Sequence, residues 1–454
     1  MKIARPIATA LRLSVIEGSI HAVYAHIITG VIINGLLLTL GATPLQFSIL
    51  NGLPLLSRIF MLPAARLIQS RDIRKPFVLL MEGISRSVWL TIPLILLLPD
   101  GSQFRIWAVL AVACISHTVG AGGAVGWLSW ISDLVPEQIR GIYFGARNAI
   151  LGIIGITGLS IASNYIDTIR ENFGEGQKYL CTIVWLIAIS FGFAATSWIL
   201  LNFQYVRRMR HMVTTGWSAI WETVFSSHGK HLAITWGAFA VATGIATGLY
   251  MPTMLQRFNM SFIDVTFYSW IALVTTTVAS PLMGRFTDRF GYKNTLILGW
   301  IGIFWQPFLF ILTPNDAPHF LGIMPITIMI DAVAGGIFWT TWGIAQTNLA
   351  IATAPSERRA GLIAGLTALA GIIGFASAMV GGTIGTVIGD GTIIHFAGMS
   401  LDNFRFPMLL SVGLRIIAGF TLFMIDEPEK KKSPVTTGQA FVTVWKILTG
   451  KPIR

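Results

Sequence analysis

The chain has 454 residues, of which 54% are hydrophobic and only 11% are charged, and its mean hydropathy is +0.70. Soluble domains carry about 25% charged residues, so these figures exclude a water-soluble fold and indicate a protein solvated largely by lipid. The net charge of +12 does not predict nucleic-acid binding, because the basic residues lie in short clusters between apolar runs.

The apolar residues fall into stretches that are each long enough to cross a bilayer as a helix. They predict twelve spans, at 13–38, 44–68, 76–98, 105–132, 143–166, 180–202, 231–255, 262–286, 295–313, 320–347, 360–388 and 406–425. No small-residue cleavage motif precedes the first stretch, so we expect it to remain in the mature protein.

The longest polar interruption lies between the sixth and seventh spans and contains a basic cluster, followed by Trp217, Ile220 and Trp221. This pattern predicts an interfacial helix that links two halves of the protein. The expected organisation is an N-terminal six-helix half at 1–202, a cytoplasmic linker at 203–230, a C-terminal six-helix half at 231–427 and a basic cytoplasmic tail at 428–454.

The distribution of lysine and arginine predicts the orientation. If both termini and the even-numbered connections are cytoplasmic, that side holds 24 of the 32 basic residues and the other side holds five. This is the bias that the positive-inside rule describes. We therefore expect a multi-pass protein of the cell inner membrane with both termini in the cytoplasm.

The two halves repeat each other at a shift of 219 residues. The matched positions are Pro136 with Pro355, Arg140 with Arg359, and the Gly-Ile-Ile-Gly sequence at 152–155 with the same sequence at 371–374. One register that holds across separate spans predicts parallel six-helix repeats, related by an axis along the membrane normal.

The connection after the eighth span carries a further motif, formed by Gly284, Asp288, Arg289, Gly291 and Lys293. It resembles the G-x-x-x-D-R-x-G-x-[RK] signature of the major facilitator superfamily, and it lies where that family has it. The resemblance covers about residues 13–425 and implies an all-α fold of two pseudo-symmetric six-helix halves that works as a secondary transporter. The stretch at 130–148 looks like a bacterial subgroup of unassigned substrate.

The first half departs from the signature, because Ala65, Gln69 and Ser70 replace its glycine, aspartate and arginine, and Arg74 alone keeps the basic end. We therefore expect the function of the signature to be lopsided between the halves.

In the second half, Asp288 is expected to bind the N-terminus of the fifth span, near Gly141–Tyr143, where unpaired N–H groups favour an anion. Arg289 is expected to reach Asp133 or Glu137 and to complete a cytoplasmic latch. The alternative is that these charges only fix the topology.

Ionisable residues inside membrane spans are functional candidates, because burial of each charge costs a few kcal/mol or more. The candidates are Glu17, His21, His26, Arg58, Glu82, Arg86, His117, Asp331 and Arg415. In one interpretation the cations bind an anionic substrate and a carboxylate carries a coupling proton. In the other, Glu82 with Arg86 and Asp331 with Arg415 only neutralise each other.

Position within the family fold weights these candidates differently. Glu82, Arg86 and Arg415 lie on peripheral spans, which favours the structural interpretation, and His117 fits a satisfied buried histidine. Function and structure remain equally open for Glu17, Arg58 and Asp331. We expect Arg58 to compete for the Glu17 carboxylate, and the alternative is a Glu17–His21 pair that anchors the helix.

Two pairs of tryptophans occupy equivalent places in the repeat. Trp127 and Trp130 end the fourth span beside Asp133, where an interfacial aromatic belt is expected. Trp339 and Trp342 form the second pair, in the tenth span, and Trp339 lies deeper and is the better candidate for stacking on an organic substrate.

The expected function is proton-coupled transport of a small organic solute by alternating access, with an organic anion favoured and a monomer as the working unit. The alternatives are a multidrug-type exporter of amphipathic compounds and a non-transporting sensor or assembly factor with the same fold. No nucleotide-binding sequence, metal-ligand cluster or nucleophile elbow is found. We therefore expect neither a cofactor nor a metal, and no enzymatic activity.

Overall fold

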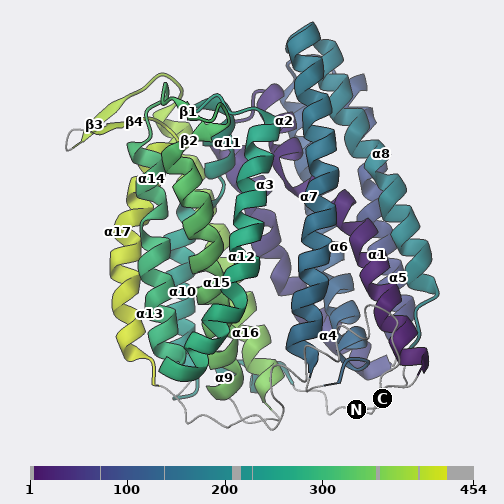
Figure 1. Ribbon diagram of the computed structural model, residues 1–454. Helices are drawn as coiled ribbons and strands as arrows, with labels where there is room; N and C mark the ends of the chain where they lie inside the picture. The colour runs from purple at the N-terminus through teal and green to yellow at the C-terminus, as the bar shows by residue number, and fades with distance from the viewer. Residues whose placement is uncertain are drawn as a thin grey trace.

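The computed structural model describes residues 5–71, 73–136, 139–206, 216–227, 229–353, 358–396 and 399–426. Within this part of the chain, twelve helical segments are long and apolar enough to cross a membrane, and they stand side by side in one bundle (Figure 1). The predicted all-α membrane fold with twelve spans is therefore confirmed.

The N-terminal half contains the first six spans, several of which are broken into consecutive helices. Its elements are α1 (Arg5–Thr29) with α2 (Val31–Thr39), α3 (Pro44–Leu56) with η1 (Ser57–Phe60) and α4 (Met61–Arg71), α5 (Arg74–Ser87) with η2 (Val88–Leu97), α6 (Gln103–Ser132), α7 (Arg140–Phe173) and α8 (Gln177–Asn202).

The C-terminal half follows α9 (Trp217–Val224), a short helix in the linker that packs against α16. Its elements are α10 (Gly229–Thr247) with α11 (Tyr250–Gln256), α12 (Phe262–Phe290), α13 (Tyr292–Phe304) with α14 (Gln306–Leu312), α15 (Ile326–Thr353), α16 (Arg359–Ile388) and α17 (Arg405–Thr421) with η4 (Leu422–Met424). The described strands form two hairpins, β1 (His319–Phe320) with β2 (Met324–Pro325) and β3 (Ile394–Phe396) with β4 (Met399–Leu401).

The bundle has two ends, which we call the terminal face and the distal face. The terminal face holds the start of α1 and the helix α9, and the distal face holds both hairpins and the junction of α7 with α8 (Figure 1).

We expect reporter fusions at Ser227 and Ser433 to report cytoplasm and fusions at Gly174 and Asn259 to report the opposite side. One reversed reporter would contradict the orientation inferred from the basic residues. Ser433 lies outside the described residues.

A proline shapes the second span where it borders the cavity described below. Pro54 lies inside α3 and supplies no N–H to the helix ladder. The next turn tightens into the 3-10 helix η1, and the Ser57 hydroxyl donates to the Pro54 carbonyl oxygen at 3.0 Å. This change of helix type sets the direction of Arg58, which lies in η1.

The halves pack closely through small residues near the distal face. A Cβ added at Gly248 would lie 2.3 Å from the Ser48 Cα, and one added at Gly382 would lie 2.6 Å from the Ser48 side chain. The Leu45 N–H donates to the Thr386 hydroxyl at 2.9 Å. Only glycine allows the two backbones to approach this closely, so α3 closes tightly against the C-terminal half here.

A ladder of polar contacts joins α7 of one half to α12 of the other. The Asp167 carboxylate accepts from the backbone N–H groups of Phe262 at 3.1 Å and Ile263 at 2.8 Å, and so caps the N-terminus of α12. The other rungs are Ser163 with Thr266 at 3.0 Å and Ser160 with Trp270 at 3.0 Å. All three rungs lie towards the distal face, which they hold closed.

The same two helices part towards the terminal face. A Cβ added at Gly152 would lie 2.7 Å from a Leu273 methyl group, whereas one added at Gly141, Gly145 or Gly284 would meet no atom within 4 Å. The structure therefore has its halves closed at the distal face, with α7 and α12 separated at the terminal face.

Helix α7 is longer than the sequence predicts. The apolar stretch ends at 166, yet the helix continues to Phe173 and ends at Gly174, which has φ +70° and donates to the Arg170 carbonyl oxygen at 2.8 Å. The extra turns are polar, and they carry Asp167 to the start of α12. Hydropathy cannot predict this extension, because it does not show that the polar Asp167 is matched by the N-terminus of α12 from the other half.

Candidate functional site

A cavity of about 560 Å³ lies between the two halves. The N-terminal half contributes one short wall, formed by Asn51, Leu55 and Arg58. The C-terminal half contributes the remaining wall, whose polar and aromatic residues include Trp236, Phe239, Tyr250, Tyr268, Gln306, Asp331, Trp339, Trp342, Gln346 and Arg415. The size of the cavity suits a small organic molecule.

Arg58 is the exposed charge of this cavity. Three charged residues line it, and two of them, Asp331 and Arg415, are each only 1% exposed. Within the described residues, Arg58 has no ion pair or hydrogen bond to another protein group. An exposed guanidinium without a partner, at the junction of two halves, presents several N–H donors to a bound anion.

The two buried charges each hold a tyrosine. Asp331, on α15, accepts a hydrogen bond from the Tyr268 hydroxyl at 2.7 Å, and its other carboxylate oxygen has no partner among the described residues. Arg415, on α17, donates to the Tyr250 hydroxyl at 3.3 Å and to the Ile303 carbonyl oxygen.

Among the described residues, Asp331 and Arg415 form no direct ion pair with an N–O distance of 4.0 Å or less. Each group is instead hydrogen-bonded to a tyrosine, Asp331 to Tyr268 and Arg415 to Tyr250. Arg415, placed on a peripheral span by the sequence, instead reaches the cavity wall.

Trp339 gives the cavity an aromatic surface. Its side chain is 41% exposed, its indole N–H donates to the Gln306 side-chain oxygen at 2.6 Å, and its edge packs against Phe239. Trp342 is stacked on the ring of Phe239, with the two ring centres 4.2 Å apart. Trp339, the stacking candidate from the sequence, thus exposes its ring to the cavity.

The tryptophans of the fourth span do not line the cavity. Trp130 is fully buried and donates to the Tyr205 carbonyl oxygen at 2.8 Å, so the expected lipid-facing belt is wrong for this residue. Trp127 lies under the Arg147 guanidinium, 4.3 Å from the ring centre.

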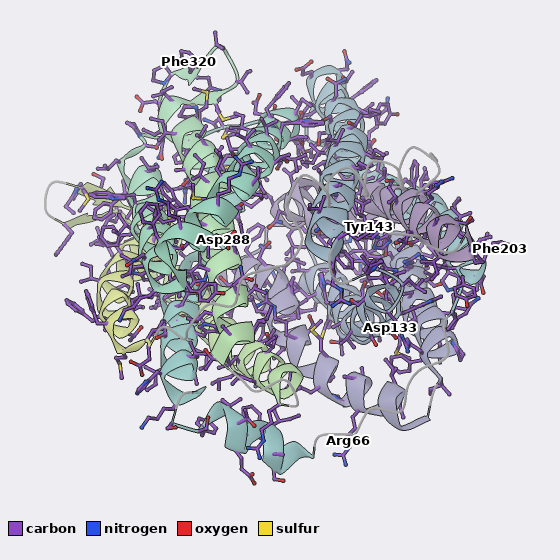
Figure 2. All side chains as sticks on the ribbon, turned by 60° about the horizontal axis from the view of Figure 1, so that its bottom comes forward. Arg66, Asp133, Tyr143, Phe203, Asp288 and Phe320 are labelled. Carbon is purple, nitrogen blue, oxygen red and sulfur yellow. The ribbon has the colours of Figure 1, made fainter. Side chains whose placement is uncertain are left out.

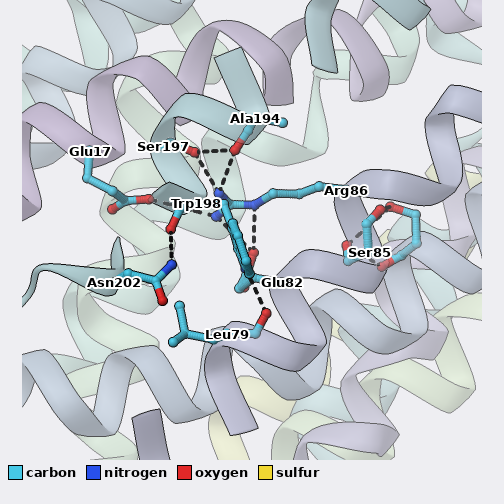
Figure 3. A network of polar contacts seen from close by, with 10 residues as sticks. Glu17, Leu79, Glu82, Ser85, Arg86, Ala194, Ser197, Trp198 and Asn202 are labelled. Carbon is cyan, nitrogen blue, oxygen red and sulfur yellow. Dashed lines mark hydrogen bonds and ion pairs between the residues drawn. The ribbon is translucent and has the colours of Figure 1, made fainter. Parts of the chain in front are cut away.

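A second polar cluster is buried inside the N-terminal half (Figure 3). Arg86, on α5, donates to the Glu82 carboxylate at 3.0 Å and to the Ser197 hydroxyl at 2.6 Å. The Glu17 carboxylate, on α1, lies 3.7 Å from the same guanidinium. Glu17 and Arg86 are each 4% exposed. One arginine therefore bridges two carboxylates from different helices, away from the cavity.

Arg147 belongs to this cluster, although it is not among the candidates that the sequence predicts. It lies two turns inside α7, is 7% exposed, and donates to the Ser14 hydroxyl at 3.3 Å. A Cβ added at Gly18 would lie 2.3 Å from its guanidinium. The missing side chain of Gly18 thus makes room for Arg147, and Gly18 is the sequence signal that points to it.

Two expectations for Glu17 are corrected by this geometry. Its ion pair is with Arg86, not with Arg58, because Arg58 turns into the cavity from η1. It forms no ion pair with His21 within the described residues, and His21 Nδ1 has no hydrogen-bond partner there.

The three histidine candidates do not line the cavity. His21 packs against Tyr24, with ring centres 5.7 Å apart, and His26 Nδ1 lies 2.8 Å from the Ala22 carbonyl oxygen of its own helix. His117 is on α6. These positions favour packing roles within the N-terminal half.

The signature residues lie at the terminal face, where Figure 2 labels Asp288, Tyr143 and Asp133. In this conformation, in which the terminal face is parted, Asp133 pairs with Arg74 at 2.6 Å, and the contact expected from Arg289 in the closed state stays a prediction. Arg289 lies 5.2 Å from the ring centre of Phe290. The partner is Arg74 because the surviving basic end of the first-half motif begins α5 beside the end of α6.

Other signature positions make contacts within their own half. Lys293 donates to the Ile425 carbonyl oxygen at 2.8 Å, Arg140 donates to the Ser132 carbonyl oxygen at 3.0 Å, and Gly291 ends α12 with φ +100°. Glu137 lies outside the described residues.

The sequence matches the Major Facilitator Superfamily over residues 18–375 and 238–454. Together with the twelve spans and the two halves around a cavity, this match shows that the chain belongs to that family of membrane transporters. The sequence-based recognition of the family is confirmed.

Named relatives are similar to parts of the chain. An MFS-type transporter of Aspergillus fumigatus is 26% identical over 43% of the chain, and the glycine betaine/proline/ectoine/pipecolic acid transporter OusA of Dickeya dadantii is 22% identical over 60%. These alignments cover 40% and 58% of the relatives, so the chain spans about half the length of the curated relatives that it matches.

Solved structures resemble the fold over nearly the whole chain. The nucleoside transporter NupG aligns with a TM-score of 0.65 at 12% identity, covering 92% of this chain and 98% of that one. A bacterial homologue of the human lysosomal transporter Spinster, in an inward-facing and unoccupied conformation, aligns with a TM-score of 0.65 at 13% identity, covering 93% and 97%. These identities establish the shared fold.

Proposed function

We propose that the protein is a proton-coupled secondary transporter of a small organic anion, which binds in the cavity between the halves. Arg58 carries this proposal, because it is the exposed and unpaired cation among the described residues that line the cavity. With Asp331 and Arg415 offsetting each other within the wall, the cavity presents a net charge of about +1 to its contents.

The terminal face is the cytoplasmic one in this proposal. The conformation is then closed to the outside by the Asp167 ladder and parted at the cytoplasmic ends of α7 and α12. Transport requires the opposite arrangement as well, in which the distal ladder breaks and the terminal ends of these helices meet.

Uptake into proteoliposomes tests the proposal. Purified protein is reconstituted with an imposed proton gradient, and accumulation of 3-phenylpropionate is compared with that of its neutral amide. We expect accumulation of the acid alone, with collapse after addition of a protonophore. Equal uptake of acid and amide would instead favour the multidrug-type alternative, which the aromatic wall of Trp339 and Phe239 also accommodates.

The two faces are proposed to close through matched aspartates at opposite ends of the same helix pair. Asp167, near the end of α7, caps the start of α12 in this conformation. Asp288, near the end of α12, is placed to cap the start of α7 when the terminal face closes. Each cap contributes about 1 kcal/mol, so its loss changes the ratio of the two conformations about fivefold.

We expect Asp167→Asn and Asp288→Asn to shift the conformational equilibrium in opposite directions. The readout is the distance between spin labels on cysteines at Gly145 and Gly284, where the structure leaves open space, after replacement of Cys114 and Cys181. Asp167→Asn favours the short distance and Asp288→Asn the long one.

Gln69→Ala is the control, because Gln69 replaces the signature aspartate in the first half. We expect it to change the label distances less than Asp288→Asn. A shift in the same direction for both aspartate variants contradicts the paired-cap proposal. Equal effects of Gln69→Ala and Asp288→Asn show that the lopsided signature has no consequence.

A further inference from the structure

Two tyrosines in the cavity wall have hydroxyl groups that are fixed by buried charges of opposite sign. The Tyr268 O–H donates a hydrogen bond to the Asp331 carboxylate at 2.7 Å, so the Tyr268 oxygen is left as a hydrogen-bond acceptor. The Tyr250 oxygen accepts a hydrogen bond from an Arg415 N–H at 3.3 Å, so the Tyr250 O–H is left to donate. Both tyrosines line the cavity and are half-buried.

The two charges that bind the tyrosines are almost completely covered, although they belong to the cavity wall. Asp331 and Arg415 are each 1% exposed. Burial of a charged group is unfavourable unless hydrogen bonds or an opposite charge compensate it. The effect of Asp331 and Arg415 on a bound molecule passes through Tyr268 and Tyr250, which become one acceptor and one donor on the same wall. A hydroxyl group on the substrate satisfies both, because it donates to one oxygen and accepts from the other.

The remaining contacts of the cavity define the rest of the molecule. Arg58, on the opposite wall, suits a carboxylate. The exposed ring of Trp339, held in place by Gln306, suits a flat apolar body.

From these three features we propose that the substrate is a flat, hydroxylated carboxylic acid, such as a hydroxyaryl carboxylate, whose hydroxyl is read by Tyr268 and Tyr250. The proposal rests on the proposed function, because it names the class of anion that the cavity selects. Asp331 and Arg415 act as positioning residues in this arrangement.

Three probes of nearly equal shape test the inference by binding to the purified full-length protein, measured calorimetrically. They are 3-(4-hydroxyphenyl)propionate, its 4-methoxy ether, which only accepts a hydrogen bond, and 3-phenylpropionate, which does neither. We expect the hydroxyl compound to bind about tenfold to a hundredfold more tightly than 3-phenylpropionate, because the latter leaves both tyrosine hydroxyls unpaired. The methoxy compound should fall between them.

Variants of the wall separate recognition from mere stability. Tyr268→Phe should remove the preference for the hydroxyl compound over the methoxy compound, and Tyr250→Phe should remove the preference for the methoxy compound over 3-phenylpropionate. Asp331→Asn should turn Tyr268 from acceptor to donor, because the amide N–H₂ can donate to its oxygen, and so shift the preference towards the methoxy compound. A purely structural role for Asp331 would weaken all three probes equally.

Equal binding of the three probes to the unaltered protein would overturn the inference and leave the proposed function standing, provided that Arg58→Ala abolishes their binding. If no probe binds, the inference is also wrong, and uptake of 3-phenylpropionate into proteoliposomes decides the proposed function separately.

Discussion

Replacement of Glu17 by glutamine is expected to abolish proton-driven accumulation of substrate while leaving substrate exchange across the membrane largely intact. Glu17 is 4% exposed and lies 3.7 Å from Arg86, which it shares with Glu82. A buried carboxylate without a countercharge takes up a proton, because the charged form is costly there. Movement of α1 against α5 during transport would therefore load or release a proton at Glu17.

The measurement is proteoliposome transport in two modes, with 3-phenylpropionate as the labelled solute. Accumulation under a proton gradient should fall to the level of empty liposomes in Glu17→Gln, whereas exchange with solute on the other side should stay within about twofold of the unaltered protein. These modes differ in whether net proton movement is needed, so a folding defect would reduce both.

Glu82→Gln is the matched control, since Glu82 bonds to the same guanidinium at 3.0 Å from the neighbouring turn of α5. We expect this variant to retain accumulation. Equal losses of accumulation in the two variants would contradict the assignment of the coupling proton to Glu17. Retained accumulation in Glu17→Gln would show that the Glu17–Arg86–Glu82 cluster has only a structural role.

Replacement of Arg58 by alanine is expected to weaken binding of 3-phenylpropionate by about a hundredfold or more. A guanidinium contributes about 1.5–3 kcal/mol for each hydrogen bond to a charged group, and a paired interaction with a carboxylate exceeds 3 kcal/mol, which corresponds to about two orders of magnitude in Kd. Arg58 has no protein partner within the described residues, so its removal leaves no buried charge unpaired.

Calorimetric titration of purified variants provides the test. Arg58→Lys keeps the charge but loses the forked geometry and should retain part of the affinity, whereas Arg66→Ala, on α4 outside the cavity, should bind normally. Unchanged affinity in Arg58→Ala would remove the observation on which the anion proposal depends.

The sequence alone predicts the transporter fold because each span is a local property. Twelve apolar runs, the 219-residue repeat and the Gly284–Lys293 motif are readable without knowing any contact between helices. The family and the all-α fold follow from these features, and both agree with the structure and with the family match.

The same information does not predict which charge meets which. Helical spacing correctly pairs Glu82 with Arg86, since residues four apart share a face. It fails for Glu17, whose partner lies on α5, and for Asp331, which bonds to Tyr268 on α12. It also does not predict that Asp133 pairs with Arg74 in this conformation.

Sequence therefore determined the elements of this protein, their order and their family, while the tertiary structure decided the cavity and its chemistry. The rotation of each helix about its axis is set by packing against neighbours that are distant in the chain, and Pro54 further turns Arg58 through η1. Hydropathy contains no information about that rotation, because a span inserts into lipid whichever of its faces meets the partner half.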